Sequence, residues 1–223
     1  MADGHGTFWK DARLVALDLE GTGAQDRDDE AILEIAVIPI NEGRPSLDDA
    51  FTTLINPQRP VPRRPWISPG LTNRTLADAP PLAEVEPELA ARLDGRVVVG
   101  HNITVDWRLL HRRCPAIQPA GLIDTLRLAR YVRPGHEGKS LTALLEQHGL
   151  LDTVSHYAPG SQAHRALWDT VGAALLLRAL IDHLPPGRSR DLTLAELSRL
   201  AGQPIGDDHV AQPDPQQTSL WDI

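Results

Sequence analysis

Short apolar runs dominate the first quarter of the chain, and they follow the two-residue period of β-strands. The run from Arg13 to Leu19 alternates and ends at a Gly-containing turn, and the run from Ala31 to Asn41 is largely apolar. Phe51 to Ile55 forms a third run. The connections between the runs are too short for helical crossovers, so we expect three antiparallel strands.

From residue 80 onward the pattern changes, and helices are predicted to alternate with strands. Arg96 to Gly100 is a short continuous apolar run, typical of a strand buried on both faces. We expect strands over 96–100 and 121–124 and helices over 80–93, 104–113, 125–131, 140–148, 163–184 and 193–201. Three antiparallel strands followed by alternating helices and strands predict an α/β fold with a mixed sheet flanked by helices.

Segments rich in Pro, Gly and polar residues separate these elements. Residues 57–69 carry five prolines and predict a loop, and residues 151–162 predict a second, polar loop. The expected organisation is a loose leader over 1–12, a main domain over 13–186, a short accessory helix over 187–206 and a flexible tail over 207–223.

Composition restricts the class of protein further. The 223 residues are 41% apolar and 23% charged, which is typical of a globular protein. Cys114 is the only cysteine, which excludes an internal disulfide and argues against a cysteine-based zinc site. The net charge of −8 argues against a protein that coats nucleic acid without specificity. The longest apolar stretch, Val171 to Ile181, is too short to span a bilayer, so we expect a soluble cytoplasmic protein without membrane contact.

Two carboxylates end the first predicted strand. Asp18 and Glu20 are two residues apart, so their side chains point to the same face. Two anions at that distance repel each other unless a cation lies between them, and oxygen ligands suit a hard divalent cation. A metal site is one interpretation of the pair; a hydrated strand end is the other.

A second polar group follows the buried run at residues 96–100. His101 and Asn102 come at the carboxyl end of that strand, where open α/β sheets place ligand-binding groups. Asp106 comes in the first turn of the next predicted helix, where the helix dipole favours a carboxylate. A role in fixing the loop and the helix explains these residues equally well.

The third group lies at the start of the long predicted helix. Asp169 shares that helix with a run of apolar residues and is expected to face inward, where an unpaired carboxylate is costly and favours a cation. His164 precedes it by five residues and is expected at the entrance of a site, although a histidine at a helix start is commonly an incidental surface residue.

Together the three groups resemble the DEDDh (DnaQ-like) family of 3′–5′ exonucleases, which includes the proofreading epsilon subunit and exonuclease X. The order is Asp-x-Glu, then Asp after Gly-His-Asn, then His-x-x-x-x-Asp. The resemblance covers residues 13–182 and extends to the segments 32–36, 55–57 and 140–145, and segment 194–205 is similar to exonuclease X. It implies an RNase H-like fold and hydrolysis of nucleic acid from the 3′ end.

The resemblance also implies a role for each residue. Asp18, Glu20 and Asp169 would bind one Mg²⁺ or Mn²⁺, and Asp106 would help Asp18 to hold a second. Two such ions about 3.5–4 Å apart assist the in-line displacement at a phosphodiester. His164 would take the proton of the attacking water near neutral pH, and a nucleoside 5′-monophosphate would leave.

Substrate contacts follow from the same resemblance, with departures from the family pattern. Gly21 and Thr22 would lie against the terminal nucleotide, as would His101 and Asn102. Gly21 stands where the family often has Thr, which puts one side-chain contact in doubt. Two further departures are the segment Ser68 to Thr72, where many relatives have His-Gly-Ile-Thr, and Val105, where an aromatic residue is common.

Basic residues are candidates for contacts with the phosphates of a single strand. The Pro-rich loop mixes Arg side chains with Trp66, which suits a nucleic-acid strand, and a stiff surface loop is the alternative. A solvated helix face is the alternative for Arg127 and Arg130. The candidates are Arg63, Arg64, Arg127, Arg130, Arg133 and Lys139.

The tail carries a separate signal. Gln217, Leu220 and Trp221 are spaced as in the short peptides by which bacterial replication and repair proteins bind the sliding clamp. A solubilising terminus is the alternative interpretation. The sequence thus favours a DNA 3′ end as substrate and the clamp as a possible partner, against an exoribonuclease of the same family or a catalytically silent adaptor.

Overall fold

A seven-stranded mixed sheet forms the centre of the protein. The computed structural model describes residues 6–135, 138–185 and 188–205. The strand order is β3-β2-β1-β5-β6-β7, and β4 also pairs with β2. The strands are β1 (Leu14–Gly21), β2 (Ile32–Asn41), β3 (Arg44–Pro45), β4 (Phe51–Leu54), β5 (Val97–Gly100), β6 (Gly121–Asp124) and β7 (Gly202–Gln203).

The strand directions confirm the predicted mixed sheet. β1 and β4 run antiparallel to β2, whereas β5 runs parallel to β1 and to β6. Strand β7 adds an antiparallel edge to β6, which the sequence analysis did not predict. Short connections join β1, β2 and β4, which accounts for their antiparallel pairing. A helix precedes β5 and another precedes β6, which accounts for the parallel pairing of these strands.

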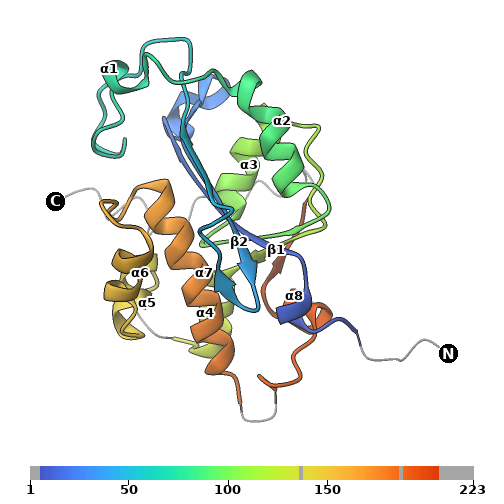
Figure 1. Ribbon diagram of the computed structural model, residues 1–223. Helices are drawn as coiled ribbons and strands as arrows, with labels where there is room; N and C mark the ends of the chain where they lie inside the picture. The colour runs from blue at the N-terminus through green and yellow to red at the C-terminus, as the bar shows by residue number, and fades with distance from the viewer. Residues whose placement is uncertain (1–5, 136–137, 186–187, 206–223) are drawn as a thin grey trace.

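Helices cover both faces of the sheet (Figure 1). Helix α7 crosses β1 and β2 on one face and contacts α4, α5 and α6, whereas α2 and α3 share a second hydrophobic cluster with β1 and β5. The helices are α1 (Asn73–Leu76), α2 (Leu82–Leu93), α3 (Thr104–Arg113), α4 (Thr125–Val132), α5 (Leu141–Gln147), α6 (Leu151–Tyr157), α7 (Ala166–Asp182) and α8 (Leu194–Ala201), with 3-10 turns at Trp9–Asp11 and Ala24–Asp29.

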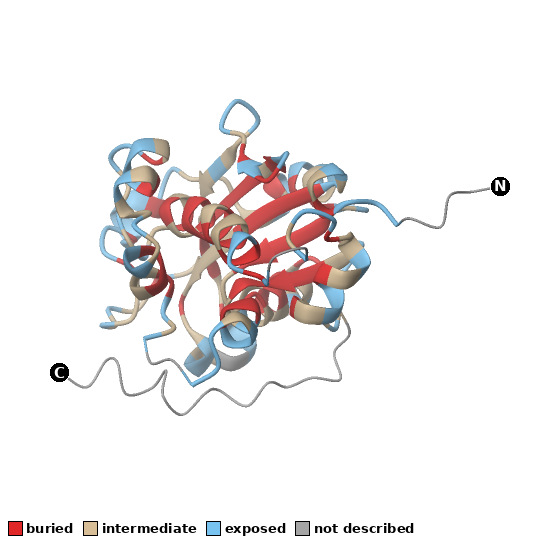
Figure 2. Ribbon diagram, turned by 90° about the horizontal axis from the view of Figure 1, so that it is seen from below, coloured by how far each residue is buried: buried red, intermediate tan, exposed pale blue. Residues whose placement is uncertain are grey.

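Successive side chains of β1 alternate between the two hydrophobic clusters on opposite faces of the sheet. Leu14 and Ala16 belong to the cluster under α7, and Val15 and Leu17 belong to the cluster under α2 and α3. Figure 2 shows the strands buried between helices whose outer turns are exposed. A strand buried on both faces is rigid, so the polar residues at its end have a fixed platform.

Helix α7 is apolar on most of its circumference because it lies between the sheet and three other helices. A Cβ at Gly172 would lie 2.9 Å from Leu145 Cδ1, so a larger residue would force the side chain of Leu145 to move. The helix begins at Ala166, not at residue 163 as predicted, because residues 163 and 164 form a turn in which His164 has a φ of 64°, and Arg165 is extended.

The predicted polar loop over 151–162 is wrong in its first half. Residues 151–157 form α6, with Val154 and Ala158 fully buried against the core. The Pro and Gly that suggested a loop, Pro159 and Gly160, come directly after the helix and end it. Apolar residues at helical spacing therefore override the local turn composition.

The expectation of a loose leader is wrong for the described residues 6–12. Trp9 is only 1% exposed and belongs to the cluster under α7. Its amide donates to the carbonyl of Leu192 at 3.1 Å, and the amide of Leu194 donates to the carbonyl of Thr7 at 2.9 Å. The segment before β1 and the segment before α8 thus hold each other against the domain.

Helix α8 is also part of the main core. Its Leu197 and Ala201 are fully buried in the same cluster as α7, and the capping box of Thr193 and Glu196 fixes its start. Within the described residues, no helix combines the length and apolar character that crossing a bilayer requires.

Replacing Trp9 with Ala tests whether the segment before β1 is part of the core. We expect Trp9→Ala to lower the free energy of unfolding by about 3–5 kcal/mol, the usual cost of deleting a buried aromatic ring. Urea unfolding measures the change. Phe8→Ala is the matched control, because Phe8 is 41% exposed, and its effect should be much smaller. Equal effects of the two variants would contradict the assignment.

Candidate metal centre

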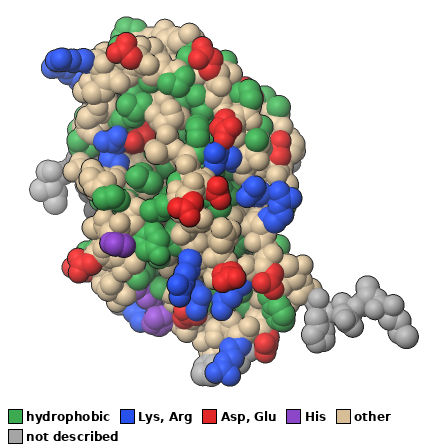
Figure 3. All heavy atoms as spheres, in the orientation of Figure 1, with side chains coloured by type: hydrophobic (Ala, Val, Ile, Leu, Met, Phe, Trp, Pro, Cys, Tyr) green, Lys and Arg blue, Asp and Glu red, His purple; other side chains and the backbone are tan. Residues whose placement is uncertain are grey.

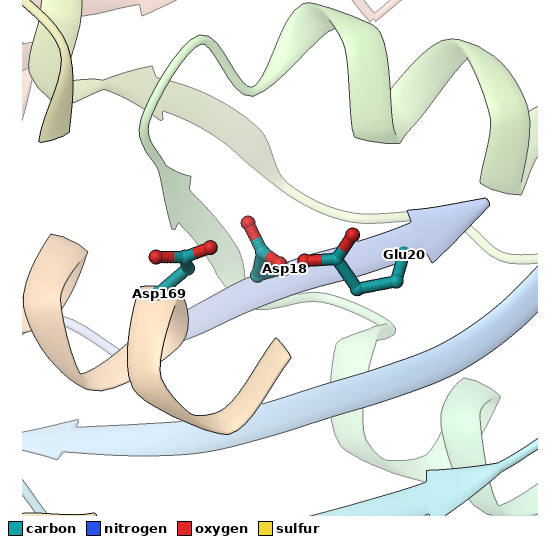
Figure 4. Close-up of side chains that lie close together, drawn as sticks. All are labelled: Asp18, Glu20 and Asp169. Carbon is teal, nitrogen blue, oxygen red and sulfur yellow. The ribbon is translucent and has the colours of Figure 1, made fainter. Parts of the chain in front are cut away.

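Three carboxylates from two elements converge at the end of β1. Asp18 and Glu20 project from the same face of the strand, and Asp169 projects toward them from the first turns of α7 (Figure 4). One carboxylate oxygen of each lies within 4.8 Å of the others. The structure therefore brings together the three residues that the sequence analysis assigned to one cation.

The fourth predicted carboxylate, Asp106, lies beside this cluster on α3. Its Oδ1 accepts a hydrogen bond from the amide of Leu19 at 3.0 Å. The pairing of β1 with β5 ends at Ala16 and Val99, so the Leu19 amide would otherwise lack a partner on that side. Asp106 thus completes the edge of β1 while its charge acts on Asp18.

Burial and mutual repulsion raise the pKa of every carboxyl in this group. Burial raises the pKa of Glu20 to about 8, although the hydroxyl of Ser68 donates to its Oε2 and opposes the shift. Burial also raises the pKa of Asp169 and of Asp106 to about 7. The pKa of Asp18 is raised well above its usual value by burial and by the charges of Asp106 and Asp169.

A divalent cation fits this donor set. Partly buried carboxylates that repel one another are stable as anions only when positive charge lies among them, and carboxylate oxygens are the ligands that Mg²⁺ and Mn²⁺ prefer. Hydrogen bonds from Ser68 and from the backbone offset only part of the repulsion. Asp18, Glu20 and Asp169 are the residues that could hold a first ion.

His164 lies at the entrance of the cluster, on the turn that precedes α7. Its side chain is exposed, and its backbone amide donates to Asp169 Oδ2 at 3.1 Å. The φ of 64° places it in the left-handed region, which histidine adopts more readily than most residues. The structure thus joins His164 to the carboxylate cluster through the backbone and leaves the imidazole at the surface.

Sequence analysis missed Glu34 as a residue of the site. Glu34 lies opposite Glu20 in the β1–β2 register and is only 5% exposed. Arg165 forms two hydrogen bonds with its carboxylate, at 2.8 and 2.7 Å. The sequence does contain a sign that Glu34 has a specific role. It is the only charged residue in the strand Ile32–Asn41, where every other residue up to Pro39 is apolar.

Gly21 and Thr22, two of the predicted substrate contacts, are closely packed against other parts of the protein. Thr22 is fully buried, and its Oγ1 accepts a hydrogen bond from the amide of Ala31 at 3.0 Å. A Cβ at Gly21 would lie 3.1 Å from both the carbonyl oxygen of Ala31 and Leu109. A side chain at this position would therefore require Ala31 or Leu109 to shift by a few tenths of an ångström.

His101 and Asn102 hold the connection after β5. The two ring nitrogens of His101 lie 2.9 Å from Thr125 Oγ1 and from the carbonyl oxygen of Lys139. The backbone amide of Asn102, whose φ is 59°, donates to Asp124 Oδ1 at 2.9 Å. These contacts fit the loop-fixing alternative, and a contact with substrate stays a prediction for both residues.

The Pro-rich loop is fastened beside the cluster. Trp66 donates to the carbonyl of Thr22 at 3.1 Å, and the guanidinium of Arg64 lies 5.3 Å above the centre of its ring. Arg64 also pairs with Asp26 at 2.7 Å, and Arg59 pairs with Asp26 at 3.2 Å. Two of the loop's arginines therefore anchor it to the turn at Ala24–Asp29.

The remaining basic candidates lie at the surface. The side chain of Arg127 donates to the carbonyl of Gly202 at 2.7 Å and so ties α4 to β7. Arg63, Arg130 and Arg133 are exposed. Figure 3 shows Lys and Arg side chains interspersed with acidic and apolar ones on the face in view, not gathered in one stripe. Phosphate contacts by these basic residues stay predictions. The residues of the predicted clamp-binding peptide, Gln217, Leu220 and Trp221, lie outside the described residues.

Comparison with known proteins decides the family. A family model described as Exonuclease (RNase_T) matches residues 15–177. The chain belongs to this exonuclease family. The DNA polymerase III subunit epsilon-like protein of Rhodobacter capsulatus is 34% identical over 183 residues, covering 81% of this chain and 25% of that protein. The DNA polymerase III subunit epsilon of Aquifex aeolicus is 28% identical over 178 residues, covering 78% of this chain and 83% of that protein.

A solved exonuclease confirms the fold. Exonuclease X in complex with 5′ overhanging duplex DNA superposes with a TM-score of 0.59 at 28% identity, covering 77% of this chain and 92% of that one. This confirms the RNase H-like mixed sheet and the predicted resemblance. The chain spans a quarter of the Rhodobacter capsulatus relative and a fifth of the 3′-5′ exonuclease DinG of Bacillus subtilis, to which it is 30% identical over 202 residues.

The raised pKa values predict how the stability of the metal-free protein responds to pH. Glu20 has a pKa of about 8 in the folded state against an ordinary value near 4.5, so the unfolded chain ionises first as pH rises. This group therefore lowers stability progressively between about pH 4.5 and 8. We expect the metal-free melting temperature of Glu20→Gln to exceed that of the wild type more at pH 8 than at pH 5.

Differential scanning fluorimetry in EDTA measures this difference, and comparison with Glu20→Gln removes the contribution of other groups. That comparison is needed because burial lowers the pKa values of His101 and His148, which acts in the opposite direction. Mn²⁺ should stabilise the wild type more at pH 8 than at pH 6. A difference between the proteins that does not depend on pH would contradict the raised pKa of Glu20.

Proposed function

We propose that this protein is a metal-dependent 3′–5′ exonuclease that removes nucleotides from single-stranded or frayed DNA 3′ ends in proofreading or repair. The observation that carries the proposal is the convergence of Asp18, Glu20 and Asp169 within 4.8 Å, with Asp106 beside them. A DNA substrate is supported by the polymerase III epsilon relatives and by the DNA complex of exonuclease X.

The acidic residues hold the metal in this proposal. Asp18, Glu20 and Asp169 bind one Mg²⁺ or Mn²⁺, and Asp18 and Asp106 hold a second. Such ions offset the negative charge of the phosphodiester and make the attacking water more acidic. The carboxylates themselves exclude a phosphate by repulsion in the absence of metal, so binding of metal and binding of substrate are coupled.

His164 acts as the general base in the proposed reaction. Its imidazole takes a proton from the water that attacks the terminal phosphorus, and the bond to the 3′ oxygen of the preceding nucleotide breaks. That oxygen is protonated by solvent, and a nucleoside 5′-monophosphate leaves. The exposed position of His164 supports this role, because the proton it accepts can return to bulk water after each turnover.

The surrounding structure supports positioning of a single strand. The Pro-rich loop brings Trp66 and Ser68 to the edge of the site, where they contact Thr22 and Glu20. An exposed Val105 lies on α3 next to Asp106. A 3′ end must leave a duplex to reach such a site, which favours single-stranded or frayed substrates. The cytoplasmic location expected from the sequence stays a prediction.

Removing one metal-binding carboxylate tests the proposed function. We expect Asp18→Asn or Asp169→Asn to lower the rate on single-stranded DNA at least about 100-fold, because loss of metal binding removes several kcal/mol of transition-state stabilisation. Shortening of 5′-labelled DNA and RNA from the 3′ end, with Mg²⁺ and then with EDTA, gives the rates and the substrate preference.

Asp182→Asn is the matched control, because Asp182 lies at the exposed end of α7 and pairs with Arg178 on the surface. It should keep the wild-type rate. A wild type that degrades RNA and leaves DNA intact would replace the proposal by the exoribonuclease alternative. A wild type that degrades neither would favour the silent adaptor.

Replacement of His164 tests the general base. Asn suits this position better than Ala, because Asn tolerates a φ of 64°. We expect His164→Asn to lower kcat by about 10²–10⁴, the usual contribution of a positioned base, and the deficit should shrink as pH rises because hydroxide needs no base. His156→Ala, at an exposed position of α6, should have no effect. A wild-type kcat at pH 7 would remove His164 from the mechanism.

Binding to the sliding clamp is a separate proposal, and it rests on the sequence of the tail alone. Leu220 and Trp221 would be the apolar anchors and Gln217 would bond at the rim of the clamp's pocket. A peptide spanning residues 212–223 should bind purified bacterial clamp with micromolar affinity, because ordering a short segment offsets part of the burial. Equal binding after Leu220→Ala and Trp221→Ala would contradict this proposal.

A further inference from the structure

Glu34 joins the sheet to the segment that carries two residues of the proposed site. Its side chain lies on β2 directly opposite Glu20, buried beside the acidic cluster. Oε2 accepts hydrogen bonds from Arg165 Nε at 2.8 Å and from the backbone amide of Ala166 at 3.2 Å, and Oε1 accepts from Arg165 Nη2 at 2.7 Å. The carboxylate is therefore bonded by the fork of one side chain and by one backbone group.

These bonds fix the start of α7. Ala166 is the first residue of the helix, and the side chain of the preceding residue, Arg165, makes no capping bond to it. Glu34 supplies the missing acceptor from another strand and places a negative charge at the positive end of the helix dipole. Asp169 follows three residues later, and His164 precedes Arg165 directly.

We propose that Glu34 and Arg165 are a positioning pair that holds His164 and Asp169 at the correct distance from the carboxylates of β1. This inference rests on the proposed function, because the distance matters through metal binding and proton transfer. The turn at His164 carries a left-handed residue, and the bonds between Glu34 and Arg165 offset the cost of keeping that turn in one conformation. Without the pair, α7 loses its attachment to β2 at Ala166.

The same pair extends to the Pro-rich loop. A Cβ built on Gly70 would lie 3.8 Å from Arg165 Nη1, so the guanidinium is in reach of the loop that brings Ser68 to Glu20. Arg165 thus stands between the β2 strand, the start of α7 and the loop. One displaced side chain would loosen the supports of Glu20 and of Asp169 together.

Positioning and simple electrostatics predict opposite results for Arg165. If the pair acted only through charge, removing the cation would leave Glu34 as an extra anion near the metal and would tighten metal binding. If the pair positions α7, removing either partner frees Asp169 and weakens metal binding. Arg165→Lys distinguishes positioning from electrostatics further, because lysine keeps the positive charge but cannot form the two hydrogen bonds of the guanidinium group.

The experiment compares Glu34→Gln, Arg165→Gln, Arg165→Lys and the double variant Glu34→Gln with Arg165→Gln. Calorimetry of Mn²⁺ binding without nucleic acid gives the metal affinity, and kcat and KM on single-stranded DNA give the catalytic effect. We expect each single variant to bind Mn²⁺ at least 10-fold more weakly, and the double variant to be no weaker than the worse single one. The loss should fall on kcat and leave KM within about threefold.

Arg178→Gln is the matched control, since Arg178 forms a surface pair with Asp182 on the same helix. It should change neither Mn²⁺ affinity nor kcat. Unchanged or tighter Mn²⁺ binding by Arg165→Gln would overturn the inference, as would wild-type affinity in Arg165→Lys. Arg165 is partly exposed, so these variants should fold even if Glu34→Gln does not.

Amide hydrogen exchange at Ala166 to Asp169 tests the inference apart from the proposed function. In metal-free protein we expect exchange there to accelerate at least 10-fold in Arg165→Gln and to stay unchanged in Arg178→Gln. Faster exchange in Arg165→Gln, together with a wild type that binds no Mn²⁺ and cleaves no DNA, would refute the proposed function and retain the positioning of α7. Unchanged exchange in Arg165→Gln would refute the positioning itself.

Discussion

Repulsion among partly buried carboxylates at the end of β1 is the constraint on which the rest of the structure depends. Burial raises the pKa values of Asp18, Glu20, Asp106 and Asp169. The negative charges of neighbouring carboxylates, Glu34 among them, raise them further. A chain would not fold around such a group unless the backbone were fixed by other means. Here a strand whose first half is buried carries two of the residues, and an almost wholly apolar helix carries the third.

The neighbouring elements each offset part of this repulsion without neutralising it. The Leu19 amide donates a hydrogen bond to Asp106, the Ser68 hydroxyl donates to Glu20, and the His164 amide donates to Asp169. Glu34 alone is matched by a full positive charge. The distinction separates two kinds of acid in one cluster: carboxylates that remain available to a cation, and one that is permanently occupied in holding the fold.

Sequence periodicity predicted the parts of the site that lie on long regular elements. Asp18 and Glu20 followed from strand alternation, and Asp169 followed from its place on an apolar helix. What depended on tertiary contacts was not predictable in this way. Trp9 lies in a polar segment that has no hydrophobic period, and β7 has only two residues. In the sequence Glu34 is a single charged residue within an apolar strand, and only the structure shows its hydrogen bonds with Arg165. Thr22 accepts a hydrogen bond from the amide of Ala31, and its contact with substrate stays a prediction.

The pairing of residues 7–9 with residues 192–194 has a consequence for biosynthesis. A ribosome releases the N-terminal segment first, yet the partners of Thr7 and Trp9 are made more than 180 residues later. Asp169 and the strand that completes the sheet edge, β7, also come late. Synthesis from the N-terminus therefore leaves Trp9 and the early strands uncovered until α7 and α8 have been made, so the nascent chain exposes apolar surface during this time.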